Sequence, residues 1–238
     1  MLNNLNATFW QNFIKILTTK EYMLLLLEGL GGTLLITFGA AVIGVLLGTF
    51  VAVVKLLPQN KWYAKVLNVI CDIYTTIFRG TPMTLQLCIM VLVVFAIRGF
   101  PIELIAILSF GINSGAYVSE AIRGGILSVD IGQTEAGRAL GLSYTKTLTK
   151  IVIPQAIKNV IPAIGNEIIA LLKETSIVSM VGEVNDLTKI AKILNGTNYI
   201  ASYFAPAVVV ALFYLAIVYL FTFIVKIIER RLRASDKR

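Results

Sequence analysis

Long apolar segments alternate with shorter polar ones along this chain of 238 residues. The pattern predicts five membrane-spanning helices, at about residues 29–54, 83–97, 102–122, 157–181 and 203–227. A helical crossing needs about 20 apolar residues, and these runs are too continuous for the alternating strands of a membrane β-barrel. Because backbone in lipid must satisfy its own hydrogen bonds, we expect an all-α, polytopic membrane protein.

The polar segments between the spans complete the predicted organisation. Residues 1–28 form an extracytoplasmic or interfacial segment, in which residues 8–20 have the helical spacing of an interfacial helix; a disordered leader is the alternative. Residues 29–228 form the transmembrane domain, with a polar loop at 130–154, and residues 229–238 form a basic tail. In the first span, Gly44 and Gly48 predict close helix packing, either within the subunit or against a second one.

Composition and charge agree with a membrane protein. Hydrophobic residues make up 57% of the chain and the mean hydropathy is +0.83, whereas soluble proteins contain about 45–50% apolar residues. The net charge of +8 lies between the apolar runs, which favours a role in membrane topology over nucleic-acid binding.

The distribution of basic residues predicts the orientation. With five spans, most lysines and arginines fall on the side of the loops at 55–81 and 123–158 and of the tail, so the positive-inside rule places these segments in the cytosol. Arg79 and Arg123 then lie at cytosolic ends of spans. The predicted location is the plasma or inner membrane, with the amino terminus outside and the carboxyl terminus in the cytosol.

Several kinds of chemistry are disfavoured by the residue inventory. The chain has no histidine and only two cysteines, Cys71 and Cys88, too few for a zinc site or a disulfide framework. The Gly-x-x-x-x-Gly-Lys-[Ser/Thr] phosphate loop is also absent. We therefore expect no metal or cofactor on this chain, no catalytic residue and no ATP hydrolysis by it.

The loop at 130–154 is a polar, glycine-bearing segment in a chain that is otherwise mostly apolar. The sequence predicts a first short helix around Ala136–Leu140 that ends at Gly141, and a second from about residue 143 to 152 that stops before Pro154. A helix pair of this kind projects from the membrane and offers a surface to a cytosolic partner. The alternative is an ordinary solvated loop.

The loop contains the triplet Glu135-Ala136-Gly137, then Gly141 after three further residues, then Ile151-x-Ile153-Pro154 after nine more. This pattern resembles the EAA loop of importer permeases in ABC transporters. Gly137 stands where the family usually has alanine, and Ile153 where it has leucine. The resemblance implies that Glu135, Ala136, Gly137, Gly141, Ile151 and Pro154 couple the chain to a separate ATPase.

Further segments resemble the polar amino acid uptake branch of that family. They include Phe78-Arg79-Gly80-Thr81-Pro82, Glu120, Arg123-Gly124-Gly125 and Lys173-Glu174-Thr175-Ser176. The resemblance implies a type I, MetI-like permease with five spans that carries a polar amino acid. Its implied partners are ATPase subunits that bind ATP and Mg²⁺, an extracytoplasmic amino acid-binding protein, and a second permease copy or a paralogue.

Charged and polar residues inside the fourth span are a second candidate site. An ionised side chain at mid-bilayer costs at least about 2.5–3.5 kcal/mol, so such residues usually face a cavity or a partner. The hypothesis is that Glu167, with Asn166, binds the ammonium or a cationic side chain of an amino acid; a structural pair or subunit contact is the alternative. Two other functions stay open: an ion-gradient-driven secondary transporter that uses Glu167, and a membrane scaffold that does not transport.

Overall fold

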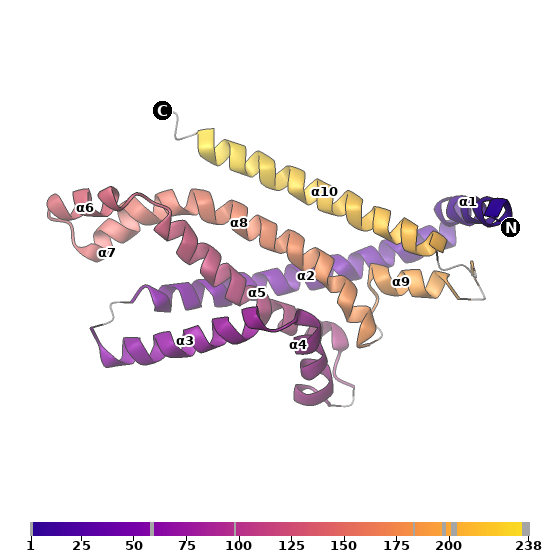
Figure 1. The fold of residues 1–238 in the computed structure, drawn as a ribbon, viewed down its shortest axis with the longest axis horizontal. Helices are drawn as coiled ribbons and strands as arrows, with labels where there is room; N and C mark the ends of the chain where they lie inside the picture. The colour runs from indigo at the N-terminus through magenta and orange to yellow at the C-terminus, as the bar shows by residue number, and fades with distance from the viewer. Residues whose placement is uncertain are drawn as a thin grey trace.

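The computed structural model describes residues 2–57, 60–97, 99–182, 184–196, 199–200 and 204–234, and all regular elements in these ranges are helical. Figure 1 shows an elongated arrangement in which α6 and α7 lie at one end and α1 and α9 at the other. The elements are α1 (Leu2–Thr18), α2 (Lys20–Lys55), α3 (Trp62–Gly80), α4 (Met83–Ile89), η1 (Met90–Val94, a π-helical turn), α5 (Ile102–Leu127), α6 (Ile131–Ala139), α7 (Tyr144–Thr147), η2 (Leu148–Val152, a second π-helical turn), α8 (Ile153–Glu174), η3 (Thr175–Met180, a 3-10 helix), α9 (Leu187–Leu194) and α10 (Phe204–Ala234).

Three helices in the described residues, α2, α5 and α10, are long and apolar enough to cross a membrane, and α3 with α4 and η1 gives a fourth if that bent pair counts as one span. They contain the predicted first, third and fifth spans. The helices run past the predicted bounds: α2 begins at Lys20, within the predicted interfacial segment, and α10 continues to Ala234, into the predicted tail. A count of five spans stays a prediction, because α8 does not meet the same test.

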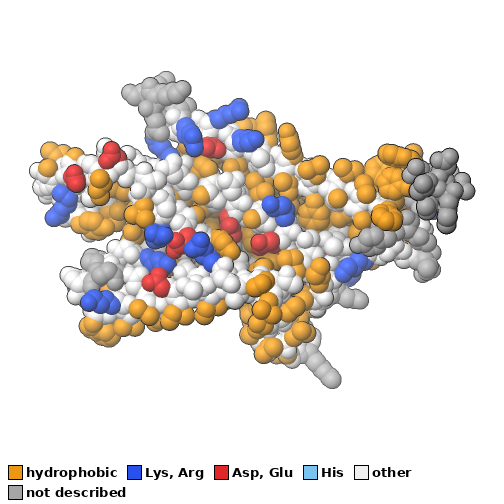
Figure 2. Space-filling view, in the orientation of Figure 1, with side chains coloured by type: hydrophobic (Ala, Val, Ile, Leu, Met, Phe, Trp, Pro, Cys, Tyr) orange, Lys and Arg blue, Asp and Glu red, His pale blue; other side chains and the backbone are white. Residues whose placement is uncertain are grey.

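The predicted loop at 55–81 is mostly helical, because α3 occupies residues 62–80; the side of the membrane on which it lies stays a prediction. The residues of α3 that are buried, Ala64, Cys71 and Thr75, are small or polar, whereas most of its large apolar side chains are exposed. Figure 2 shows this apolar row along the lower edge of the molecule. An outward apolar face is what lipid contact requires, because lipid solvates apolar side chains. The Lys, Asn and Asp residues of this helix lowered its hydropathy and hid it from the search for apolar runs.

The predicted second span at 83–97 is also wrong as a single crossing. Its helical part ends at Val94, and α4 with η1 bends away from α3 by 108°. Twelve residues span only about 18 Å, too short for the hydrocarbon core of a bilayer. If α3 with α4 and η1 counts as one crossing, that crossing is a broken helix with α3 as its longer limb.

Side chains satisfy the carbonyl groups freed at this break. The amide of Asn113 in α5 donates to the Phe78 carbonyl (3.0 Å), and the amide of Gln86 donates to the same carbonyl (2.9 Å) and to that of Thr81 (3.1 Å). Asn113 also donates to Oε1 of Gln86 (2.9 Å). Irregular backbone survives at membrane depth only where protein supplies such partners, so the break at Pro82 is a stabilised feature of the fold.

The close contact between α2 and α5 forms the centre of the bundle. A Cβ atom at Gly44 would lie 2.8 Å from Oγ of Ser114, and one at Gly48 would lie 2.7 Å from Val118. The Gly-x-x-x-Gly pair therefore serves packing within the subunit, one of the two possibilities that the sequence left open.

At the end of the molecule opposite α6, α9 rests on α2. Asp186 caps α9 by accepting hydrogen bonds from the N–H groups of Thr188 (3.0 Å) and Lys189 (3.0 Å). Burial raises the pKa of the Asp186 carboxyl, while these N–H donors lower it. The N–H of Leu187 donates to the buried Thr33 hydroxyl of α2 (3.1 Å), so the cap and the span are joined directly.

Candidate functional site

The predicted loop at 130–154 is a compact helical hairpin. Asp130 caps α6 by accepting from the N–H of Gly132 (2.8 Å), and Ser143 caps α7. Between the two helices Gly141 has φ +80°, and N–H groups of Gly141 and Leu142 donate back to the carbonyls of Arg138 and Gly137. This is a Schellman arrangement, which favours glycine at that position. The predicted helix end at Gly141 is confirmed.

The second helix of the loop differs from its prediction. Instead of stopping before Pro154, α7 continues through the π-helical turn η2 into α8, and Pro154 occupies the second position of α8. Because a proline within a continuous helix cannot donate an N–H to the preceding turn, the wider π-helical turn η2 directly before Pro154 accommodates it. The second limb of the hairpin and α8 form one continuous helix, with only a local change of helical register at η2.

Gly137, the position at which the loop departs from the usual alanine, is buried in the hairpin. A Cβ atom there would lie 2.7 Å from Cγ2 of Thr147 and 3.2 Å from Cδ1 of Ile151. Glycine therefore lets α6 approach the second limb of the hairpin closely. The loss of helix propensity expected from glycine is offset by this tight packing.

The outer surface of the hairpin is exposed and partly apolar. Glu135 and Ala136 are exposed, as are Ile131 (70%) and Leu140 (80%). Gly137 is buried, so the six predicted coupling residues do not form one contiguous surface. Exposed large apolar side chains on a polar hairpin are typical of a protein-binding surface.

Side-chain hydrogen bonds tie this hairpin to the bundle. Gln155 of α8 donates to the side-chain oxygen of Gln133 (3.3 Å), and Asn159 donates to the hydroxyl of Ser128 (2.8 Å). These contacts join the first turns of α8 to α6 and to the end of α5. A displacement of the hairpin would therefore be transmitted to α8.

Along α8, exposed polar residues form a stripe consisting of Gln155, Asn159, Asn166 and Lys173. Their spacings of four and seven residues keep them within about 40° on one face of the helix. A polar face in a helix at membrane depth is expected to contact water, a ligand or another protein rather than lipid. Asn166, one of the two predicted binding residues, lies on this face.

Glu167 lies beside the stripe and is half-buried against α5. The Ser114 hydroxyl of α5 is close enough to interact with its carboxylate. Ser114 is itself buried and forms no hydrogen bond of standard geometry within the described residues. Among the residues that the structure describes, Glu167 has no ion-pair partner. The predicted pair thus splits, with Asn166 on the open face and Glu167 at the edge of the core.

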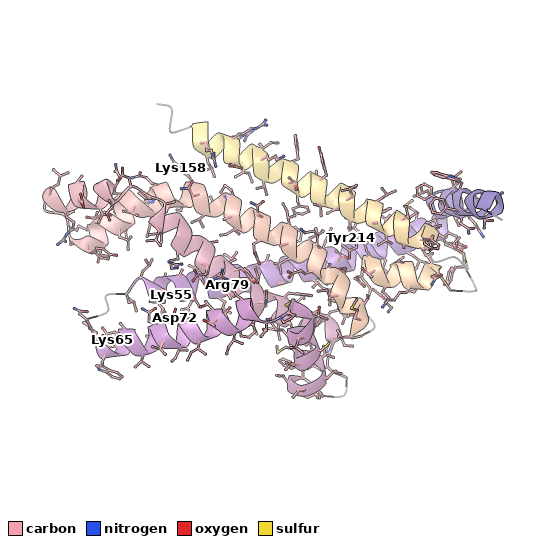
Figure 3. All side chains as sticks on the ribbon, in the orientation of Figure 1. Lys55, Lys65, Asp72, Arg79, Lys158 and Tyr214 are labelled. Carbon is pink, nitrogen blue, oxygen red and sulfur yellow. The ribbon has the colours of Figure 1, made fainter. Side chains whose placement is uncertain are left out.

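A network of charged side chains joins α2, α3 and α5, and most of it was not predicted. Lys55 Nζ lies 3.1 Å from Glu120 Oε1 and 3.0 Å from Asp72 Oδ1, and Arg123 lies 2.7 Å from Glu120 Oε2. Figure 3 shows Lys55 and Asp72 side by side. The spacing of Glu120 and Arg123 is visible in the sequence, but the other contacts depend on how the helices pack.

Arg79 belongs to this network and does not lie in a cytosolic loop. It occupies the last turn of α3, where its guanidinium lies 3.8 Å from Glu120 and 5.5 Å from the ring centroid of Tyr117. Its predicted position at the cytosolic end of a span stays a prediction, but the helix that carries it, α3, was not predicted. Glu120 is thus approached by three cationic side chains from three helices.

Comparison with known proteins agrees with this architecture. Residues 44–234 match the family described as binding-protein-dependent transport system inner membrane component. The chain is 39% identical over 213 residues to the arginine transport system permease protein ArtQ of Bacillus subtilis (strain 168), covering 89% of this chain and 94% of the relative. It is 41% identical over 215 residues to the putative glutamine transport system permease protein GlnP of Rickettsia bellii (strain RML369-C), covering 90% and 95%.

Solved structures show the same fold. A chain from the crystal structure of an amino acid ABC transporter with histidines is 38% identical and superposes with a TM-score of 0.83, covering 92% of this chain and 98% of that one. A chain of the MetNI methionine ABC transporter in an inward-facing conformation is 23% identical, with a TM-score of 0.74 and coverage of 90% and 99%. The MetI-like architecture is therefore confirmed.

Proposed function

This chain belongs to the binding-protein-dependent transport system inner membrane component family, as a permease subunit of an amino acid ABC transporter, and we propose that it forms the path of a polar amino acid. The main observation that supports this path is the polar stripe on α8, with Glu167 at its edge. A carboxylate without an ion-pair partner at this depth suits a cationic group in transit. Glu167, with Asn166, therefore favours a cationic or zwitterionic substrate over an acidic one.

The hairpin of α6 and α7 supports coupling to separate ATPase subunits. Leu140, which is 80% exposed at the end of α6, offers an apolar contact for a partner, and the hydrogen bonds of the hairpin to α8 provide a mechanical link to the path. ATP and Mg²⁺ would bind to those partners. Closure of the ATPase pair would move the hairpins and alternate the access of the path between the two sides of the membrane.

The other proposed features concern the assembly and its orientation. The stripe on α8 is exposed in a single subunit, so a second copy or a paralogue would complete the walls of the path. An extracytoplasmic binding protein would deliver the substrate to the end that carries α1 and α9. The hairpin and the carboxyl terminus would face the cytosol, and the amino terminus the outside, in the plasma or inner membrane.

Neither alternative function gains support from the comparisons. The relatives are named as ABC permeases, which gives no support to an ion-gradient-driven secondary transporter. A scaffold that does not transport would leave the polar stripe on α8 without a role.

Substitution at Gly141 tests the coupling proposal. Because valine strongly disfavours the positive φ found there, Gly141→Val should distort the hairpin, at a local cost of about 1–2 kcal/mol. Asparagine tolerates that conformation, so Gly141→Asn is the matched control. Co-purification with the ATPase subunits and ATP-driven uptake into proteoliposomes are measured. Val should reduce both and Asn should preserve them; normal uptake by the valine variant would contradict the proposal.

A further inference from the structure

A groove lies between α8 and α10, and most of its α8 residues point away from the polar stripe. Its volume is about 270 Å³. Three residues of α8 and three of α10 make up most of its walls: Ile161, Ile164, Ile168, Phe221, Ile224 and Ile228. Around the helical wheel these α8 residues lie roughly 140–160° from Asn166, whereas Pro162, which also lines the groove, lies nearer to the stripe. Most of the α8 wall of the groove therefore faces away from the proposed path.

The groove has no polar lining, which decides what can occupy it. Where α8 and α10 approach most closely, a Cβ atom at Gly165 would lie 2.6 Å from Cγ2 of Val225, and this contact forms part of the floor. A polar amino acid would lose its hydrogen bonds to water in such a space. An acyl chain would lose nothing. Because both helices are expected to lie within the bilayer, lipid is the apolar ligand that surrounds them.

Basic residues lie at one end of the groove, because the face of each helix that lines the groove continues to a lysine or an arginine. Continuing its face on α10 by one turn beyond Ile228 leads to Arg231, and continuing it on α8 by one turn before Ile161 leads to Lys158. Figure 3 shows Lys158 level with the carboxyl-terminal end of α10, and Figure 2 shows basic side chains gathered over that end. Basic residues at the mouth of a groove between spans favour an anionic lipid headgroup.

We infer that the α8–α10 groove is a binding site for an anionic phospholipid, with an acyl chain along the isoleucines and the phosphate at Arg231, where the charge of Lys158 adds to the positive potential of that end. The basic residues of α10 are not equivalent in this site. Arg230 and Arg233 point to the opposite side of the helix, and Arg233 is already paired with Glu229 at 2.7 Å. Arg231 is the basic residue of α10 that continues the lining face.

This difference supplies a matched pair of variants. Arg231→Gln and Arg230→Gln remove the same charge from adjacent, exposed positions, so they alter membrane orientation and overall electrostatics alike. The transporter complex is delipidated in detergent and titrated with phosphatidylglycerol or phosphatidylcholine, and bound lipid is counted by native mass spectrometry. Wild type should prefer phosphatidylglycerol. Arg231→Gln should weaken its binding about fivefold, the effect of one basic residue, and Arg230→Gln should leave it unchanged.

A third variant tests the apolar part. Ile224→Trp places a larger side chain in the groove, where Ile224 is 42% exposed, and should lower the occupancy of phosphatidylglycerol in an intact complex. The inference is overturned if both arginine variants weaken binding equally, or if the two lipids bind alike. It is also overturned if Ile224→Trp separates the permease subunits, since a second copy would then fill the groove.

Discussion

Two neighbouring antiparallel helices, α8 and α10, differ in the side chains that they expose. The described part of α10 is apolar through most of its length and exposes Leu212, Leu215 and Tyr219. By contrast, α8 exposes Asn166 and Lys173 and half-buries Glu167, and it does not qualify as a span by length and composition. Apolar content thus reports contact with lipid. A helix that lines a polar path is recognised by the alignment of its exposed polar residues.

The largest expected difference between α8 and α10 is their tolerance of a new lysine in the middle of the helix. Leu215 in α10 is 59% exposed and Asn166 is an exposed residue in the middle of α8. Leu215→Lys should lower the membrane-inserted yield severely, because a lysine facing lipid costs about 2.5–3.5 kcal/mol. Asn166→Lys should insert almost normally. The yield of folded complex in the membrane fraction is measured, and similar yields for both variants would contradict the comparison.

The same contrast explains what the sequence predicted well. The cores of α2, α5 and α10 followed from apolar runs, and the end of α6 followed from the turn requirement of Gly141. These features depend on local properties, which one sequence contains. The groove between α8 and α10 also follows helix register, but its volume requires the packed structure.

The missed helix α3 and the unpredicted contacts of Glu120 have a common physical cause. In α3, Asp72, Thr75 and Arg79 face other helices while isoleucines and valines face outward, so an average over the segment cancels the signal. A helical-wheel analysis of residues 62–80 would have found this outward apolar face. The contacts of Lys55 and Arg79 with Glu120 join positions that are far apart in sequence, and no local pattern predicts them.

Among the ion-pair residues, Glu120 should contribute most to the stability of the folded protein, because three cationic side chains approach it. Glu120 is mostly buried, and Glu120→Gln leaves Lys55 and Arg123 without their shared carboxylate. We expect a loss of about 2–3 kcal/mol of stability, somewhat less than for a fully buried pair. Thermal unfolding of the purified complex should shift down by roughly 5–10 °C. An unchanged midpoint would show that the network is not a stabilising junction.

Glu167 should affect transport rather than stability. Glu167→Gln keeps the side-chain shape and removes the charge, so the concentration for half-maximal uptake of a cationic amino acid should rise about tenfold, equivalent to about 1.4 kcal/mol. Glu174→Gln, one heptad further along α8, is the matched control. Uptake into proteoliposomes that contain the ATPase subunits and the binding protein is measured. Equal effects of the two variants would argue against a specific contact at Glu167.

The smallest effect is expected at the carboxyl-terminal end of α10. Glu229 pairs with Arg233 across one helical turn at 2.7 Å, but the arginine side chain is 71% exposed. Solvent-exposed pairs of this spacing contribute only about 0.3–0.5 kcal/mol, because water and salt screen the charges. Glu229→Gln should therefore move the unfolding midpoint by no more than about 2 °C. Uptake should stay the same.

Glu120→Gln and Glu229→Gln make the same chemical change in two environments, so their difference measures the effect of burial. The gap between their midpoints should persist in high salt, where the contribution of the exposed pair falls further. If Glu229→Gln destabilises the complex as much as Glu120→Gln, the end of α10 is packed against a second subunit in the assembly. The apolar, lipid-facing character assigned to α10 would then hold only for the part of the helix before Glu229.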